Sequence, residues 1–235
     1  MIRHLSIFAL LNFLICFPLL ILGAGDEKEF DSIFDGLSLS DWHVVPEESS
    51  SDWSVVNHTI QGKGSEKRHS YLLYDDAKLK DFELKFTYRL PGEGNTGVSI
   101  RMRPDTTGKR AFESYHADLG HVGIGPHILG AWDFHFATRK EHPCNRGTSL
   151  VIEPDGSTRH DIIPGALRLD QINAHQWNEV HIIARGNHFQ FFINGKLASE
   201  VTDNFKDSFK QGSIALQIHE KGMIVDFKDL RLKRL

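Results

Sequence analysis

The chain has 235 residues, of which 40% are hydrophobic and 25% are charged, a balance that is typical of a globular protein with a hydrophobic core. Its 27 basic and 31 acidic residues are mixed along the sequence and give a net charge of −4. The sequence has no basic patch, which argues against a nucleic-acid partner.

The first 25 residues have the pattern of an export signal. Arg3 and His4 precede an apolar run from Leu5 to Leu22, small residues follow, and the sequence then becomes charged. We therefore expect a signal peptide at 1–25 and an exported domain at 26–235, periplasmic or secreted. The alternative is an uncleaved membrane anchor, because the apolar run approaches spanning length. No segment after it is apolar enough to span a membrane.

Strict alternation of apolar and polar residues predicts a half-buried strand at 82–90, with its apolar face in the core and its polar face in solvent. A Pro- and Gly-containing turn follows at 91–95. The next strand, 96–103, alternates again and is predicted to turn its apolar residues to the core and Arg101 and Arg103 away from it.

The last third of the sequence repeats this pattern of short strands and turns. Asn194-Gly195 is the strongest hairpin signal in the chain. We expect no helix of three or more turns after residue 25, and one large sandwich or barrel. A region near 120–175 is rich in Gly, Pro and His, and we expect it to be a long functional loop. The predicted strands in this third are 180–184, 188–193, 196–201, 212–219 and 223–230.

Six motifs occur in order from about residue 30 to the C-terminus. They are 34–42 (FDGLSLSDW), 94–101 (GNTGVSIR), 112–118 (FESYHAD), 177–179 (WNE) with 192–196 (FINGK), 212–219 (GSIALQIH) and 225–232 (VDFKDLRL). Each motif alone is weakly specific, but together they resemble the 3-keto-disaccharide hydrolase family.

This resemblance implies an all-β fold, a concanavalin A-like jelly roll of two stacked antiparallel sheets. It also implies a carbohydrate partner and cleavage of 3-keto-glycosides or 3-keto-disaccharides. A ketone at C3 acidifies the hydrogen on C2, so a general base can remove it while the C1 substituent leaves by elimination or is replaced by water.

Apart from Arg103 and Trp132, the candidate site residues lie in the matched motifs. Glu113 or His116 is the expected base, and Arg101 is expected to stabilise the enediolate. Glu113, Asp118 and His219 are the candidate ligands of a divalent metal ion. The expected substrate-binding residues are Asn95, Arg103, Tyr115 and Gln217, with Trp132 as a stacking platform for a sugar ring.

Alternation along 212–219 supports part of this assignment independently. Ile214, Leu216 and Ile218 must face the core, so Gln217 and His219 face the other way. Of the histidines in the predicted loop, His127 and His135 are the ones expected to reach the cleft.

Two other functions fit the same sequence. The first is an ordinary glycosidase with two catalytic carboxylates, for which no second carboxylate can be paired with Glu113. The second is a non-catalytic carbohydrate-binding sandwich, because a fold does not fix a function.

Overall fold

The computed structural model describes residues 29–65, 69–120 and 127–235. Apart from two short 3-10 helices, all regular elements in these ranges are strands. They are β1 (Asp31–Ser32), β2 (Trp42–Val45), η1 (Glu47–Asp52), β3 (Trp53–Val56), β4 (Thr59–Lys63), β5 (Ser70–Tyr74), β6 (Phe82–Arg89), β7 (Gly97–Pro104), β8 (Phe112–Asp118), β9 (Trp132–His135), β10 (Thr148–Ile152), β11 (Thr158–Ile162), η2 (Leu169–Gln171), β12 (Asn178–Arg185), β13 (His188–Ile193), β14 (Lys196–Asp203), β15 (Ser213–Ile218) and β16 (Ile224–Arg234).

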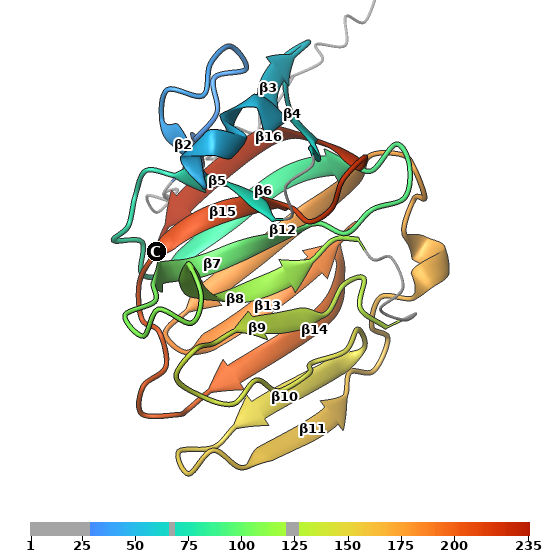
Figure 1. Cartoon of the computed structure of the whole chain (residues 1–235). Helices are drawn as coiled ribbons and strands as arrows, with labels where there is room; N and C mark the ends of the chain where they lie inside the picture. The colour runs from blue at the N-terminus through green and yellow to red at the C-terminus, as the bar shows by residue number, and fades with distance from the viewer. Residues whose placement is uncertain (1–28, 66–68, 121–126) are drawn as a thin grey trace, which may run out of the picture.

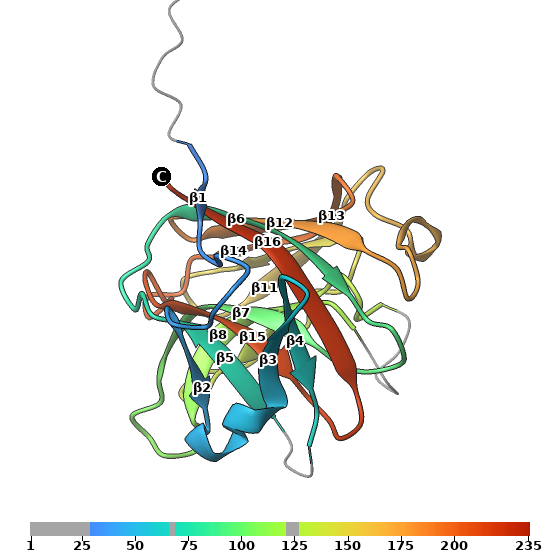
Figure 2. The same ribbon diagram turned by 90° about the horizontal axis from the view of Figure 1, so that it is seen from above.

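The strands form two stacked sheets, seen face-on in Figure 1 and as two layers in Figure 2. The larger sheet has ten strands in the order β11-β10-β14-β13-β12-β6-β16-β4-β3, with β1 on β16. The smaller has six in the order β2-β5-β15-β7-β8-β9. Neighbours pair antiparallel, except that β10 runs parallel to β14. The predicted β-sandwich is therefore confirmed.

Alternation of side chains builds the core between the sheets. Along β6, the residues at every second position are buried, namely Phe82, Leu84, Phe86 and Tyr88. This is the half-buried pattern expected for a strand with one face in the core. The same rule turns alternate residues of β8 and β15 away from the core, onto the outer face of the smaller sheet.

A bulge in β7 overturns the predicted orientation of Arg101. The backbone of Arg101 has a positive φ of 50°, and the pairing register with β8 shifts between Ile100 and Arg103. An extra residue in a strand reverses the alternation after it. Arg101 therefore points inward and is fully buried, whereas Met102 joins an apolar cluster on the outer face.

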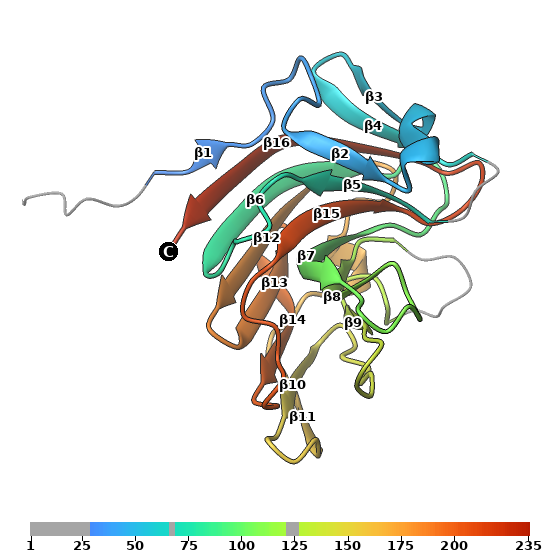
Figure 3. The same ribbon diagram turned by 60° about the vertical axis from the view of Figure 1, so that its left-hand side comes forward.

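The region 120–175 is not one long loop, which corrects the sequence-based prediction. Its described part contains β9, which pairs with β8, and the β10–β11 hairpin, which extends the larger sheet beyond β14 (Figure 3). Each of these strands is only four or five residues long and follows Gly- or Pro-containing turns, so periodicity is a weak signal there. The parallel β10–β14 pair brings together segments far apart in the sequence.

Among the described residues, no helix is both long enough and apolar enough to cross a membrane. The predicted signal peptide, 1–25, lies outside the described residues.

The buried Arg101 guanidinium should be a large contributor to stability. It donates to the carbonyls of Phe209 and Lys80 at 2.8 and 3.1 Å and to the Asp81 carboxylate at 3.1 Å. Arg101→Met would leave these acceptors unpaired, so we expect the unfolding free energy in urea to fall by about 3 kcal/mol. Arg159→Met, on an exposed side chain of β11, is the control and should cost less than about 1 kcal/mol. Equal losses would contradict this assignment.

Candidate functional site

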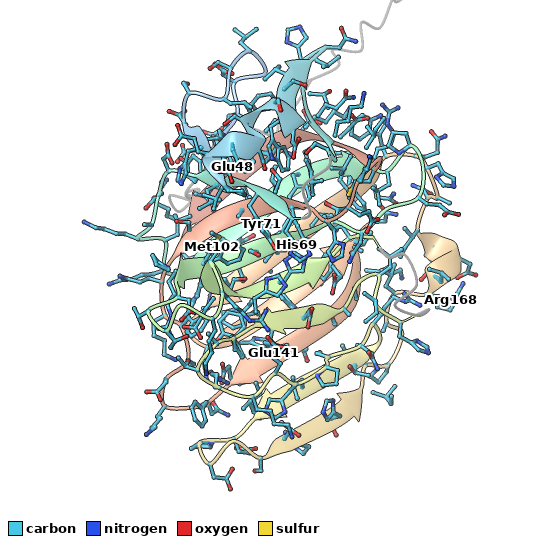
Figure 4. All side chains as sticks on the ribbon, in the orientation of Figure 1. Glu48, His69, Tyr71, Met102, Glu141 and Arg168 are labelled. Atoms are coloured by element: carbon cyan, nitrogen blue, oxygen red, sulfur yellow. The ribbon has the colours of Figure 1, made fainter. Side chains whose placement is uncertain are left out.

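A cavity of about 620 Å³ lies on the outer face of the smaller sheet. Its floor includes residues of β5, β15, β8 and β9 in the smaller sheet, and its walls include the segments before β7 and β8. Figure 4 shows His69 and Tyr71 over this face. Its polar lining consists of His69, Tyr71, Asn95, Arg110, His116, Asp118, Asp133, His135, Gln217 and His219.

Four histidine rings gather in this cavity as two pairs. The ring centroids of His69 and His219 lie 4.5 Å apart, and those of His116 and His135 lie 4.7 Å apart in a stacked arrangement. Like-charged rings at these distances would repel one another. The four rings therefore place several nitrogen donors and acceptors in one cavity.

A chain of hydrogen-bonding groups fixes the His116–His135 pair. His116 Nδ1 is 3.1 Å from Ser99 Oγ, which accepts a bond from Ser114 Oγ at 3.1 Å. Ser114 Oγ is in turn 3.5 Å from His135 Nδ1. The His116 ring lies against β7 at Gly97, where a Cβ would be only 2.2 Å from Nε2. Glycine at this position therefore makes room for the ring.

Burial keeps both of these histidines neutral. Burial and the neighbouring His135 hold the pKa of His116 well below its usual value. Burial, followed by the charge of Arg110, lowers the pKa of His135 to about 4. Removing an imidazolium from water is unfavourable, which is why a buried histidine loses its proton more easily.

Asp118 has the opposite shift, because burial disfavours the charged carboxylate. Burial, and then the charge of Asp133, raises its pKa well above the usual value. Its Oδ1 lies 3.8 Å from His116 Nε2. The structure thus favours a protonated Asp118, which can donate a hydrogen bond in the way a carboxylate cannot.

Glu220 holds one wall of the cavity in place. Its Oε2 is 3.0 Å from His219 Nδ1, and its Oε1 accepts a bond from the Asn95 backbone N–H at 2.7 Å. A carboxylate can only accept, so Nδ1 of His219 carries the proton in this contact. In the tautomer that this contact selects, Nε2 of His219 carries the lone pair.

Two buried oxygens of the cavity have no hydrogen-bond partner among the described residues. They are Asn95 Oδ1 and Gln217 Oε1. The amide nitrogen of Gln217 is occupied, because it donates to the Tyr71 hydroxyl at 3.1 Å. Buried acceptors normally have partners, so these two atoms indicate a ligand that brings hydroxyl donors.

Five predicted site residues line this cavity together, namely Asn95, His116, Asp118, Gln217 and His219. His135, which was expected to reach the cleft, also lines it, whereas His127 does not.

The other predicted site residues lie elsewhere, which corrects their expected placement. Tyr115 faces the core, where its hydroxyl donates to Asp203 of the larger sheet at 2.6 Å. Trp132 is also in the core, packed on Phe189 with ring centroids 6.1 Å apart. Arg101 points inward at the bulge described above. In each case the strand's alternation or its bulge sets the side.

Glu113 and Arg103 form a structural pair outside the cavity. Glu113 Oε2 accepts from Arg103 at 2.9 Å, and Oε1 accepts from the backbone N–H groups of Ala137 and Thr138 at 2.9 and 3.2 Å. Glu113 shares the inward parity of Tyr115, two residues later in β8. The carboxylate therefore fastens the segment after β9 to the sheet.

The predicted metal-ligand set does not assemble. Glu113 lies outside the cavity that contains Asp118 and His219. Across the described residues, no group of three His, Cys, Asp or Glu side chains is arranged to hold a metal ion.

Sequence reasoning missed His69, Arg110, Asp133 and Glu220. The alternation Trp132-Asp133-Phe134-His135 could have placed Asp133 and His135 on one face, had 132–135 been recognised as a strand. Glu220 directly follows His219, but its double contact depends on a loop that is distant in sequence. His69 carried no local signal.

Acid should destabilise the fold through His135. Its folded pKa of about 4 lies below the ordinary value of 6.5, so the unfolded chain binds more protons between these pH values. The contribution of His135 to the free energy of unfolding is fully present above pH 6.5 and is lost as the pH falls toward 4. The expected loss is about 2 kcal/mol, after allowance for the ring's partial exposure.

Urea unfolding of wild type and His135→Gln at several pH values measures this contribution. We expect the variant to lose less stability between pH 6.5 and 4. His116 acts in the same direction and Asp118 in the opposite one, so only the difference between the two proteins reports His135. Identical pH slopes for both proteins would refute the assignment.

Solved structures share this architecture at low sequence identity. A protein from Parabacteroides distasonis, provisionally assigned as a glycosyl hydrolase, has 16% identity and a TM-score of 0.58, with 88% of this chain and 94% of that chain covered. The carbohydrate-binding module CBM66 from Bacillus subtilis has 15% identity and a TM-score of 0.52, with 82% and 95% covered.

A Bacillus subtilis protein of unknown function with a galectin-like fold has 10% identity and a TM-score of 0.53, with 83% and 90% covered. At these identities the likenesses establish the fold alone. No curated protein sequence matches this chain significantly.

The family is established by sequence. Residues 29–233 match the 3-keto-alpha-glucoside-1,2-lyase-like domain, which is nearly the whole of the chain outside the predicted signal peptide. Membership supports a carbohydrate-related function. The chain therefore belongs to the 3-keto-alpha-glucoside-1,2-lyase-like domain family.

Proposed function

We propose that this protein is an enzyme that cleaves 3-keto-glycosides by removing the C2 proton and expelling the C1 substituent. The observation that carries the proposal is the pairing, in one cavity, of a buried carboxyl group that favours its protonated form with a histidine whose Nδ1 is held by a carboxylate. These are Asp118 and His219. An acid and a base are the two groups that enolisation of a ketone requires.

We assign Asp118 the role of hydrogen-bond donor to the C3 oxygen of the substrate. As the proton leaves C2, negative charge develops on this oxygen. A protonated carboxyl group in a dry site can donate a short hydrogen bond to it and so stabilise the enolate more than the ketone. Burial raises the pKa of Asp118 and so favours this protonation state.

His219 is assigned as the general base, a role that the sequence analysis gave to Glu113 or His116. Glu220 fixes the proton on Nδ1, so Nε2 is the atom that accepts the C2 proton. His116 is less suited, because burial makes its imidazolium unfavourable.

The proposed step is balanced as an elimination. The C2–H electron pair forms the C1–C2 double bond, and the C1–O bond breaks with its electrons on the aglycone oxygen. The C2 proton goes to His219, and the aglycone oxygen takes a proton from an acid or from water. Addition of water to the unsaturated product would complete a hydrolysis.

We assign recognition of the sugar hydroxyls to the two unpaired acceptor oxygens of the cavity. Asn95 Oδ1 and Gln217 Oε1 are buried without partners among the described residues, and a pyranose brings several O–H donors. Satisfying both oxygens would orient the ring near Asp118, at the end of β8, and His219, which directly follows β15.

His219→Asn should abolish cleavage while preserving binding. We expect purified protein to release the alcohol from methyl 3-keto-α-glucoside, and the variant to lower kcat at least 100-fold, because general-base catalysis contributes about that much. Calorimetry should give similar dissociation constants for both proteins. His160→Asn, on exposed β11, is the matched control.

If the wild type releases no alcohol but binds the sugar, the enzyme proposal fails. A non-catalytic carbohydrate-binding sandwich is then the better account, and the cavity acts as a recognition site alone.

Asp118→Asn and Asp118→Ala together test the protonation state of the acid. An amide donates a hydrogen bond as a protonated carboxyl group does, so Asn should retain kcat within about tenfold of wild type. Alanine removes the donor and should lower kcat by about 100-fold or more. Losses of equal size would show instead that Asp118 acts as a carboxylate.

A further inference from the structure

We propose that the leaving group of the substrate binds in a second, apolar pocket, which makes glycosides with a flat hydrophobic aglycone the preferred substrate class. This inference rests on the proposed function, because it assigns the part of the groove beyond the sugar site. It concerns a cavity of about 680 Å³ on the same face of the smaller sheet.

Three members of an apolar cluster outside the main core form the floor of this second pocket, namely Leu73, Met102 and Phe112, and the half-buried Val45 packs against the cluster and also lines the pocket. The other two members are Ala215 and Tyr71, and Tyr71 lines the sugar cavity. Met102 belongs to this floor only because the bulge at Arg101 turns it outward. Figure 4 shows Met102 and Tyr71 over the same sheet face, with His69 farther along it.

The two pockets adjoin each other. Val45, Ala111 and Phe112 line both of them. The Phe112 ring meets Tyr71 edge-on at 4.5 Å and lies 6.1 Å from the His135 ring, so it stands where the apolar floor meets the polar one. A ligand that fills both pockets must therefore cross this boundary with a single linkage.

The chemistry of the floor distinguishes an apolar group from a second sugar. The sugar cavity has two unpaired acceptors, Asn95 Oδ1 and Gln217 Oε1, whereas Leu73, Met102 and Phe112 on the floor of the second pocket carry no group that can bond a hydroxyl. Among the described residues that line the second pocket, Ser208 Oγ is the one buried polar atom without a partner. Burying sugar hydroxyls there would leave them unpaired, which is unfavourable. An aromatic aglycone would instead gain from apolar burial and from edge contacts with Phe112.

The size and rim of the pocket fit the same occupant. A cavity of this volume accommodates a ring system rather than a methyl group. Its wall includes Phe209, on whose ring the Arg103 guanidinium stacks at 3.7 Å, and the exposed Lys210 and Gln211. This polar rim can contact phenolic substituents at the edge of a flat aglycone.

Binding of paired glucosides tests the inference. Calorimetry would compare the methyl and 4-methylumbelliferyl glycosides of 3-keto-glucose, and the same two glycosides of unoxidised glucose. For each of the two sugars that the protein binds, we expect the 4-methylumbelliferyl glycoside to have a dissociation constant at least tenfold lower than that of the methyl glycoside. A 3-keto-disaccharide should bind no more tightly than the methyl glycoside.

Ala77→Trp is designed to fill the second pocket without touching the sugar site. Ala77 is an exposed turn residue that lines only the second pocket, so the fold should tolerate the change. We expect the variant to lose the aryl preference while its affinity for the methyl glycoside and its cleavage of methyl 3-keto-glucoside stay within twofold of wild type. Lys78→Trp, on the neighbouring position outside the pocket lining, is the matched control and should keep the preference.

Failure of this inference differs from failure of the proposed function. Equal affinities for aryl and methyl glycosides, or an Ala77→Trp variant that retains the preference, would overturn the aglycone pocket even if methyl 3-keto-glucoside is cleaved. Absence of cleavage with an intact, Ala77-dependent aryl preference would overturn the enzyme proposal alone. Absence of binding by every glycoside would overturn both.

Discussion

The position of Arg101 in the sandwich sets the character of the outer face. One residue with positive φ inserts a bulge into β7, and from that point the side chains exchange faces. The guanidinium enters the protein and bonds carbonyls of two other segments, while Met102 moves to the surface side. Without the bulge, a charged group would lie where the apolar pocket is, and Met102 would be buried in the core.

A neighbouring strand accommodates this irregularity. A Cβ on Gly212 would lie 2.4 Å from the carbonyl carbon of Arg101, so β15 can approach the bulge only because this residue is glycine. The register between β15 and β7 shifts at the same place. The bulge is thus a feature of both strands, and it divides their shared face into an apolar half and a polar half.

The polar half of the face is arranged to avoid charge. Burial favours neutral His116 and His135, and it favours the protonated form of Asp118. Such groups would be poor ligands for an ionic substrate but are suited to a ketose, whose reaction creates charge only in the transition state. Burying these ionisable groups costs folding free energy, and a catalytic role explains that cost better than a contribution to stability does.

Sequence patterns predicted the fold well and the site in part. Long alternating strands such as β6 and β15 obey period two, so Gln217 and His219 were placed correctly on the outer face. The alternation rule placed Arg101 on the wrong face, because the sequence Ile100-Arg101-Met102 contains no glycine that would indicate a bulge. Strand β9 was missed because four residues carry too little periodicity, and with it the positions of Trp132 and Asp133. Glu113 looked catalytic because it is an acidic residue in a matched motif, yet its partners come from a segment whose path only the tertiary structure defines.

The contrast between Glu113 and Asp118 explains why a carboxylate in a matched motif is an insufficient guide to catalysis. Both lie in β8, five residues apart, and both are almost completely buried. Glu113 has a guanidinium and two backbone donors, so its charge is balanced and its hydrogen-bonding capacity is used. Among the described residues, the ionisable groups that interact with Asp118 are His116 and Asp133, and neither favours a negative charge on it. A carboxyl group that is buried but left without such donors is the one whose proton remains available to a substrate, and in β8 that residue is Asp118.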